Sequence, residues 1–174
     1  MSKDNLPEQV NPFRFAENGV ALHGHLLIKE MPRLCTSLAN DSGTVDVQAQ
    51  FGVDDQGVRI LHGNFKTQVM LTCQRCMEPF SYEIIADFVA GIVGNEAEVK
   101  QLPESYEPIT VEEGDLNLPD VVEEELMLQL PIVPMHLPEE CQVKLPLVAE
   151  STDSSIEQIK ESPFKVIESL KEKK

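Results

Sequence analysis

Four residues with metal-binding side chains stand out by their type and spacing. Cys73 and Cys76 form a C-x2-C pair, and His136 and Cys141 follow about sixty residues later. Zinc in structural sites is held by four thiolate or imidazole ligands, and a tight turn can direct both thiols of a C-x2-C pair toward one ion. The candidate zinc ligands are therefore Cys73, Cys76, His136 and Cys141.

The same cysteine pair allows two other interpretations. It could be a redox dithiol, or two structural cysteines that bind no metal. A redox dithiol needs a thiol at the N-terminus of a helix, where the helix dipole lowers its pKa, but residues 77–80 lead into a segment with strand-like alternation. The later pair has an unusual spacing, with Pro138 between the two ligands. The sequence disfavours redox chemistry and leaves zinc binding and metal-free cysteines open.

The other cysteine and the remaining histidines give weaker signals. Cys35 falls on the apolar side of a predicted early helix, which favours a position in the core. His23 and His25 share one face of a short strand, a geometry that could bind a metal but is more typical of surface histidines. His62 lies within a long predicted strand, and we interpret it as structural.

The charge of the chain is strongly negative and unevenly distributed. Its 174 residues include 30 acidic and 14 basic side chains, for a formal net charge of −16. Proteins that bind nucleic acid gain affinity by placing Lys and Arg on phosphates, so this balance opposes direct binding to bare RNA. Residues 96–125 contain eleven acidic side chains and one base, Lys100.

This acidic region is either a solvated surface or a docking surface for a basic protein. Complementary charge speeds association and orients the partners, and ribosomal proteins are an abundant class of basic proteins. The candidate partner-binding residues are Glu112, Glu113, Asp115, Glu123, Glu124 and Glu125.

Several functional classes lack support in the sequence. No stretch approaches the roughly 20 apolar residues of a membrane span, and the N-terminus lacks the apolar core of a secretory signal. Four cysteines without such a signal predict a cytoplasmic protein whose thiols stay reduced or bind metal. No nucleophile elbow, phosphate-binding loop or dinucleotide fingerprint occurs. We therefore predict no enzymatic activity, no membrane association and no small-molecule substrate.

Hydrophobic alternation predicts an antiparallel sheet. Apolar and polar residues alternate over 45–51, 58–72 and 80–90, with a turn at 54–57 between the first two runs. A period of two is typical of strands that bury one face. The three runs predict a meander in which the C-x2-C pair lies at the tip of the second hairpin. Further short strands are expected at 20–26 and 107–111.

Helical spacing is found in two other segments. Residues 28–38 carry apolar side chains at helical intervals, although Pro32 must then lie in the first turn. Residues 117–130 begin with a suitable N-cap, Asn117, and place Glu123 and Glu124 away from the apolar face. Together these features predict an α+β fold, an antiparallel β-sheet meander with a few packed helices.

The chain is expected to contain one folded domain and a tail. Residues 1–141 form the predicted single α+β domain, which begins with an extended lead-in over residues 1–19 that could add an edge strand. Residues 142–161 are polar and weakly patterned, and predict a flexible acidic linker. Residues 162–174 predict a short C-terminal helix with Ser162 as its N-cap.

Several runs of the sequence resemble one known family. The chain is similar to the YceD family, the large ribosomal RNA accumulation proteins, in three runs: LTCQRCMEPF at 71–80, LPESYEPI at 102–109 and VEEELMLQLPIVPMH at 122–136. The tail also resembles the short C-terminal helix of that family, with SPFKVIESLK at 162–171. The resemblance covers nearly the whole chain.

The resemblance implies a part in the biogenesis of the large ribosomal subunit. Members are linked to the synthesis, processing or accumulation of 23S ribosomal RNA, and the family implies no established enzymatic activity. Such a role suggests contact with the 23S rRNA precursor, which the net charge of −16 opposes. Our hypothesis is therefore that the chain acts mainly through a basic ribosomal or assembly protein, and the candidates for local contact with the RNA are Arg59, Lys66 and Arg75. Many members carry a second cysteine pair where this chain has His136 and Cys141. A change from cysteine to histidine at position 136 keeps a nitrogen ligand available for zinc. The same change also fits a branch of the family that has lost the metal.

Two other functions stay open at this stage. One is a zinc-stapled adaptor or chaperone for a basic protein, unconnected with ribosomal RNA levels. The other is an enzyme, either a dithiol oxidoreductase or a nuclease that acts on the precursor RNA. Because no catalytic constellation is found in the sequence, a non-enzymatic factor in large-subunit biogenesis is the preferred hypothesis.

Overall fold

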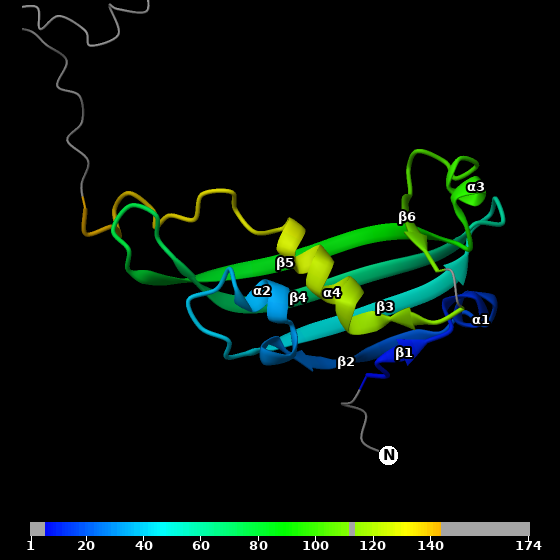
Figure 1. The fold of residues 1–174 in the computed structure, drawn as a ribbon, viewed down its shortest axis with the longest axis horizontal. Coiled ribbons are helices and arrows are strands. Elements are labelled where there is room, and N and C mark those ends of the chain that lie inside the picture. Colours follow the sequence, from blue (N-terminus) through cyan, green and yellow to red (C-terminus); the bar gives the residue numbers. More distant parts are fainter. Residues whose placement is uncertain (1–5, 112–113, 144–174) are drawn as a thin grey trace, which may run out of the picture. The chain divides into compact units, whose positions relative to one another are not determined.

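The computed structural model describes residues 6–111 and 114–143. Its main feature is a five-stranded sheet in the order β2-β3-β4-β5-β6 (Figure 1). The strands are β2 (Ala21–Leu27), β3 (Thr44–Val53), β4 (Arg59–Thr72), β5 (Pro79–Val93) and β6 (Glu107–Thr110). The first four run antiparallel to their neighbours, and β6 runs parallel to β5. The predicted α+β fold with its meander is confirmed, and the sheet is mixed at one edge.

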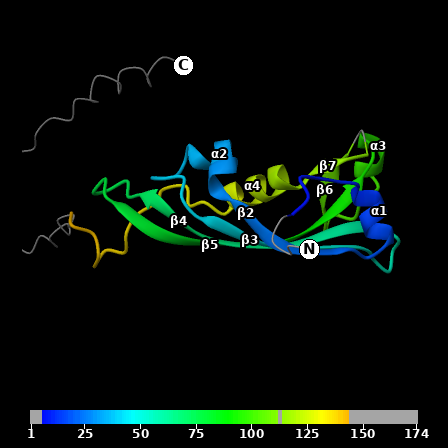
Figure 2. The same cartoon turned by 90° about the horizontal axis from the view of Figure 1, so that it is seen from below.

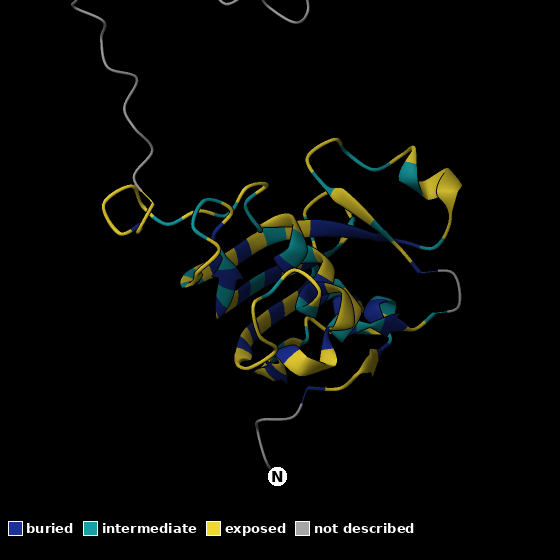
Figure 3. Cartoon of the chain, turned by 60° about the vertical axis from the view of Figure 1, so that its left-hand side comes forward, coloured by how far each residue is buried: buried dark blue, intermediate teal, exposed yellow. Residues whose placement is uncertain are grey.

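Helices cover one face of this sheet and leave the other face open (Figure 2). Along β3 and β4 the burial alternates from residue to residue, as the stripes in Figure 3 show. The strand register places Val47 opposite Phe65, and Phe65 opposite Ala86, so these three buried side chains form one row across the sheet. Each fully buried Val or Phe contributes roughly 1.5–3 kcal/mol, so rows of this kind stabilise the covered face.

The helix α4 (Leu118–Leu128) lies over the covered face of the sheet. Asn117 caps it, because the Asn117 Oδ1 accepts a hydrogen bond from the amide of Asp120 at 3.4 Å. Pro119 occupies the first turn, where its missing N–H costs nothing. The fully buried side chains of α4 are Leu118, Val122 and Leu126. The predicted helix and its N-cap are confirmed.

The N-terminal segment contains a helix that local patterns did not predict. β1 (Gln9–Val10) pairs with β7 (Leu116–Asn117) in a separate two-stranded sheet, and α1 (Pro12–Glu17) follows β1. Asn11 caps α1, since its Oδ1 accepts from the amide of Arg14 at 2.9 Å. The expectation of an extended lead-in is wrong over α1, because an Asn-Pro pair is a strong helix start.

The helix predicted over residues 28–38 is divided in two. A 3-10 turn, η1 (Ile28–Glu30), is separated from α2 (Pro32–Cys35) by Met31, which has φ −113° and ψ 80°. Contact with a proline ring disfavours the helical conformation for the residue before it, which explains the break. A further short helix, α3 (Glu96–Val99), was also not predicted; it lies in the acidic connection after β5 and is capped by Asn95.

Glu123 lies at the contact between α4 and α2 and is only 3% exposed. Its Oε1 accepts hydrogen bonds from the amides of Arg33 at 2.7 Å and Leu34 at 3.0 Å, and its Oε2 accepts from the Arg33 Nε at 2.8 Å. The prediction that Glu123 faces solvent and belongs to a docking surface is therefore wrong. The reason is that the amides at the start of α2 have no partner within that helix, and this carboxylate supplies one.

The predicted tail lies almost wholly outside the described residues. The helix over 162–174, and the linker over 142–161 apart from residues 142 and 143, stay predictions. Within the described ranges, no helix is both long enough and apolar enough to cross a membrane.

We predict that Glu123→Ala lowers the free energy of unfolding by about 2–3 kcal/mol. The change removes the acceptor for two amides at the start of α2, and a buried donor left without a partner costs roughly 1–3 kcal/mol. Urea denaturation measures the loss. Glu124→Ala, at an exposed position of the same helix, is the matched control and should change stability by less than about 0.5 kcal/mol. Equal effects of the two changes would contradict the inferred contact.

The Glu123 contact also predicts a pH dependence of stability. Burial opposes ionisation, but hydrogen bonds from the Arg33 side chain and from the amides of Leu34 and Arg33 outweigh it and hold the pKa of Glu123 below its ordinary value of 4.5. Because the folded-state pKa is depressed, the stabilisation is fully present above pH 4.5 and is lost as the pH falls through the folded-state pKa. The stability difference between the wild-type chain and Glu123→Gln should shrink at acidic pH. A difference that stays constant from neutral to strongly acidic pH would exclude this contribution.

Candidate metal centre

The predicted cysteine hairpin is present, with Cys73 and Cys76 in the turn that joins β4 to β5. We call residues 73–76 the knuckle. The amide of Met77 donates to the Cys73 carbonyl at 2.8 Å, and the amide of Cys73 donates to the Glu78 carbonyl at 3.0 Å. Met77 has φ 64°, a left-handed conformation that few residues other than glycine adopt, and it turns the chain back toward β5. The turn brings the two thiols within 4.8 Å of each other.

A second segment reaches the knuckle from the end of α4. Beyond this helix the chain runs without helix or strand through residues 131–138, which we call the arm. The amide of Gln74 donates to the Pro134 carbonyl at 2.9 Å, and the Arg75 Nη2 donates to the His136 carbonyl at 2.9 Å. In Figure 1 the arm, in yellow, runs toward the turn between β4 and β5. These hydrogen bonds hold the arm, and with it His136, against the knuckle.

The knuckle, the arm and the residues directly after the arm bring together all four predicted metal ligands. The ligand atoms of the cluster lie within 4.8 Å of one another, and they belong to Cys73, Cys76, His136 and Cys141. The Cys76 Sγ and the His136 Nδ1 are 3.3 Å apart. Ligands placed tetrahedrally at zinc distances are separated by about 3.5–3.8 Å, so these donors need to move little to surround one ion. The thiols of Cys73 and Cys141 are buried, and the other two side chains are half-buried.

Hydrogen bonds at the knuckle favour the thiolate of Cys73. Burial disfavours this charge, but donors that include the amides of Cys76 and His136 outweigh it and lower the pKa of Cys73 to about 5. At Cys76 a backbone hydrogen bond from Glu78 favours the thiolate, yet burial and the neighbouring thiols raise its pKa above the ordinary value. Metal ligation requires deprotonated sulfur, so the Cys73 sulfur is prepared for a metal, whereas Cys76 would release a proton on binding one.

Arg75, between the two cysteines, contacts two of the four candidate metal ligands from outside the cluster. Its Nε donates to the Cys141 Sγ at 3.1 Å, while its Nη2 reaches the carbonyl of His136. The ring of Phe80 lies 4.9 Å from the imidazole of His136. Partners of this kind orient metal ligands and stabilise charge on sulfur. The sequence offered Arg75 as a candidate RNA contact, whereas here it holds the metal-type donors in place. The only sequence signal for that structural role was its position between the two cysteines.

The surroundings of the cysteine pair differ from those of a redox dithiol. Cys73 directly follows β4, and β5 begins at Pro79, so neither thiol stands at the start of a helix. A third thiol, that of Cys141, joins the same cluster. Three sulfurs and one nitrogen are the donor set of a common type of structural zinc site.

Cys35 and two of the other histidines lie apart from this cluster. The Cys35 thiol donates to a backbone carbonyl at 3.1 Å and packs against the core. On the open face of the sheet, His25 pairs with Asp46, and His62 lies 3.3 Å from Asp87. Among residues 6–111 and 114–143, only the cluster at the knuckle gathers three or more metal-type donors.

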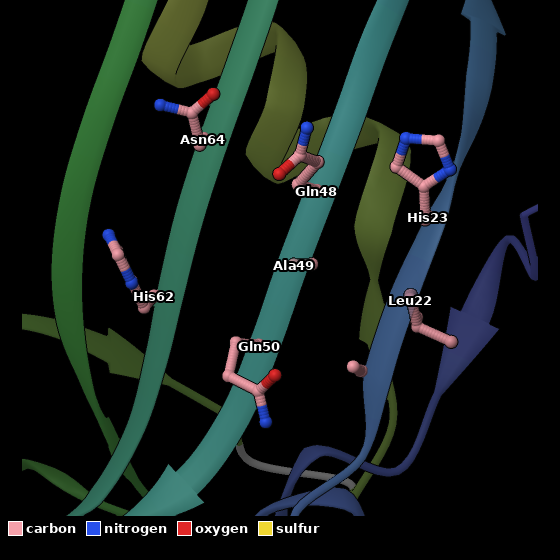
Figure 4. Close-up of a pocket in the computed structure, with 8 residues that line it drawn as sticks. Leu22, His23, Gln48, Ala49, Gln50, His62 and Asn64 are labelled. Atoms are coloured by element: carbon pink, nitrogen blue, oxygen red, sulfur yellow. The ribbon is translucent and has the colours of Figure 1, made fainter.

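The open face of the sheet carries a shallow hollow of about 240 Å³ (Figure 4). The polar side chains around it are His23, Gln48, Gln50, His62 and Asn64. Two candidate RNA contacts on β4 already have acidic partners: Lys66 lies 2.8 Å from Glu83, and Arg59 lies 3.3 Å from Glu17. These pairs reduce the positive charge that β4 can offer to a phosphate.

The acidic candidates differ in their surroundings. Asp115 and Glu124 are exposed, and Glu125 is half-buried. Glu124 and Glu125 line a hollow of about 370 Å³ between β6 and α4. Burial and the neighbouring carboxylates raise the pKa of Glu125. Glu112 and Glu113 lie outside the described residues. The surface of α4 therefore still presents two candidate carboxylates for a partner.

Comparison with known proteins agrees with the resemblance of the sequence runs. A family model described as "Large ribosomal RNA subunit accumulation protein YceD" matches residues 61–171, which include the knuckle, α4 and the arm. A protein of the same name from Haemophilus influenzae is 34% identical over 174 residues, which cover 99% of this chain and 100% of the relative. No solved structure is significantly similar to this chain. On the strength of both matches, the chain belongs to the YceD family.

Proposed function

We propose that this chain promotes the accumulation of large-subunit ribosomal RNA as a non-enzymatic assembly factor. The observation that carries the proposal is the family match over residues 61–171, supported by a relative of the same name that aligns along its whole length. That name refers to the accumulation of an RNA and to no reaction. The matched region contains every ligand of the candidate metal centre.

The donor set of the cluster supports a structural task. A catalytic zinc keeps one coordination position open for water or substrate, whereas a structural zinc is closed by four protein ligands. Three thiols and one imidazole converge at the knuckle, and two of the thiols are buried. We infer that the cluster fixes the local structure and does not activate a substrate.

We further propose that the cluster holds zinc and thereby fastens the arm to the knuckle. Cys73 and Cys76 belong to the hairpin, whereas His136 and Cys141 come from the chain beyond α4. When bound, Zn²⁺ would supply a cross-link between segments about sixty residues apart. The hydrogen bonds of the knuckle to the arm already place the ligands, so little further ordering is needed.

The surface charge supports the docking of a basic ribosomal or assembly protein. Residues 101–143 contain eleven acidic side chains and no Lys or Arg. The candidate contacts that carry this charge are Glu112, Glu113, Asp115, Glu124 and Glu125. Complementary charge would speed association with a basic partner. The 23S rRNA precursor would then be reached through that protein, because a chain of net charge −16 gains little from contact with phosphates.

We predict about one zinc per chain in protein purified without a chelator. The double variant Cys73→Ser/Cys76→Ser should lose the metal, because it removes two of the four ligands. Cys35→Ser is the matched control and should keep the full zinc content, since Cys35 lies apart from the cluster. Elemental analysis measures the ratio. A wild-type chain that is folded by circular dichroism yet free of metal would refute zinc binding.

We predict that deletion of the gene lowers 23S relative to 16S ribosomal RNA. Total RNA separated by electrophoresis, from cultures matched in growth rate, gives the ratio. The wild-type gene should restore it, and Cys73→Ser/Cys76→Ser should restore it less, because the arm would no longer be fastened. An unchanged ratio in the deletion strain would favour the second candidate, an adaptor or chaperone for a basic protein, which the same acidic surface supports.

A further inference from the structure

Exposed apolar side chains gather on the arm and directly beside it. Eleven large hydrophobic residues are exposed in the described part of the chain, and six of these fall within residues 128–143. The six are Leu128, Ile132, Val133, Met135, Leu137 and Val143. Ile132 is 101% exposed, as open as in an extended peptide. Apolar side chains concentrated in this way at a surface mark an interaction site, whereas scattered ones do not.

The arm is held in one conformation despite this exposure. The knuckle donates hydrogen bonds to the carbonyls of Pro134 and His136, and the amide of His136 approaches the Cys73 Sγ at 3.5 Å. Prolines restrict the backbone further, at Pro131, Pro134 and Pro138. A segment that is ordered in advance loses less entropy when it binds, so more of its apolar contact free energy contributes to affinity. The arm therefore has the properties of a docking element.

A hollow of about 340 Å³ lies beside the arm at the end of α4. Ser37 and six apolar residues line it, and the apolar ones are Leu71, Met127, Leu130, Pro131, Ile132 and Pro134. Protein interfaces draw most of their affinity from a few side chains that fill such pockets. The hollow is suited to receive one apolar side chain of a partner, with Ile132 at its rim.

The charge around the arm favours a basic partner. Between residues 101 and 143 there is no Lys or Arg, and Glu139 and Glu140 follow the arm directly. Both of these glutamates are exposed, as is Glu78 beside the knuckle. An acidic partner would be repelled from this surface, whereas Lys or Arg side chains around an apolar anchor would be attracted to it.

We propose that the arm and the hollow beside it form the docking surface for a basic protein of the large ribosomal subunit. The partner would present an apolar side chain flanked by Lys or Arg. This inference rests on the proposed function for the class of partner, a basic ribosomal protein. It adds the apolar part of the surface that such a partner would contact. Binding proceeds through side chains, because three prolines deprive the arm of the amide donors that pairing with a partner strand requires.

The test is binding of the full chain to the RNA-free proteins extracted from purified large ribosomal subunits. The immobilised wild-type chain should retain at least one basic protein after RNase treatment. Ile132→Ser/Met135→Ser should bind at least about tenfold less of that same protein, as expected when interface anchors are truncated. The matched control, Ile85→Ser/Val89→Ser, removes two exposed apolar side chains from the open sheet face and should bind like the wild type. Zinc content and circular dichroism verify that both variants are folded.

The outcomes separate this inference from the proposed function. If Ile132→Ser/Met135→Ser retains as much protein as the wild type, the arm is not the docking surface, and the proposed docking of a basic protein stands. If the wild-type chain retains no protein, both proposals of docking fail.

A second copy of the chain is the other occupant that the experiments address. Sedimentation of the full chain at rising concentration should show monomers for the wild type and for Ile132→Ser/Met135→Ser. Self-association of the wild type that is lost in this variant would assign the arm to an interface between copies and overturn the proposal.

Discussion

The packing of α4 against the covered face of the sheet determines where the parts of the candidate site lie. Its apolar side chains are fully buried, and Glu123 ties the same helix to the start of α2. With the helix placed by these contacts, the chain after its C-terminal end runs toward the end of the sheet where β4 turns into β5. The meeting of knuckle and arm therefore depends on a helix contact that contains no metal ligand.

The knuckle and the arm satisfy each other's polar groups. The amide of Gln74 and the Arg75 guanidinium donate to carbonyls of the arm, and the amide of His136 in the arm approaches the Cys73 sulfur. Arg75 also donates to the Cys141 sulfur just beyond the arm. Such donors are needed because a buried sulfur that carries negative charge is costly unless it is paired. A divalent cation would meet the same need more strongly. Hydrogen bonding and metal coordination thus favour one arrangement, and the hydrogen bonds can place the donors before an ion arrives.

The surface combines excess negative charge with a fixed apolar segment. Basic side chains on the sheet are paired, as Lys66 is with Glu83, whereas residues 101–143 carry eleven acidic side chains and no Lys or Arg. The arm displays its apolar side chains within this acidic stretch. The combination suits a protein partner that is basic and partly apolar better than RNA, whose phosphates have the same sign of charge.

Local signals in the sequence by themselves determined β3, β4 and β5, the start of α4 at Asn117 and the C-x2-C pair of Cys73 and Cys76 at a hairpin tip, because alternation, capping and close donor spacing act between neighbouring residues. The helix start at Asn11 was also within reach of such signals, although it was not predicted. Tertiary structure alone decided the burial of Glu123, the approach of His136 to the knuckle and the exposure of Ile132. Each of these depends on whether a distant segment packs against the residue. The start of α2 covers Glu123 and the hairpin meets His136, whereas no segment within the described ranges covers Ile132. Periodicity reports which face of an element is apolar, but it does not report which other element, if any, will cover that face.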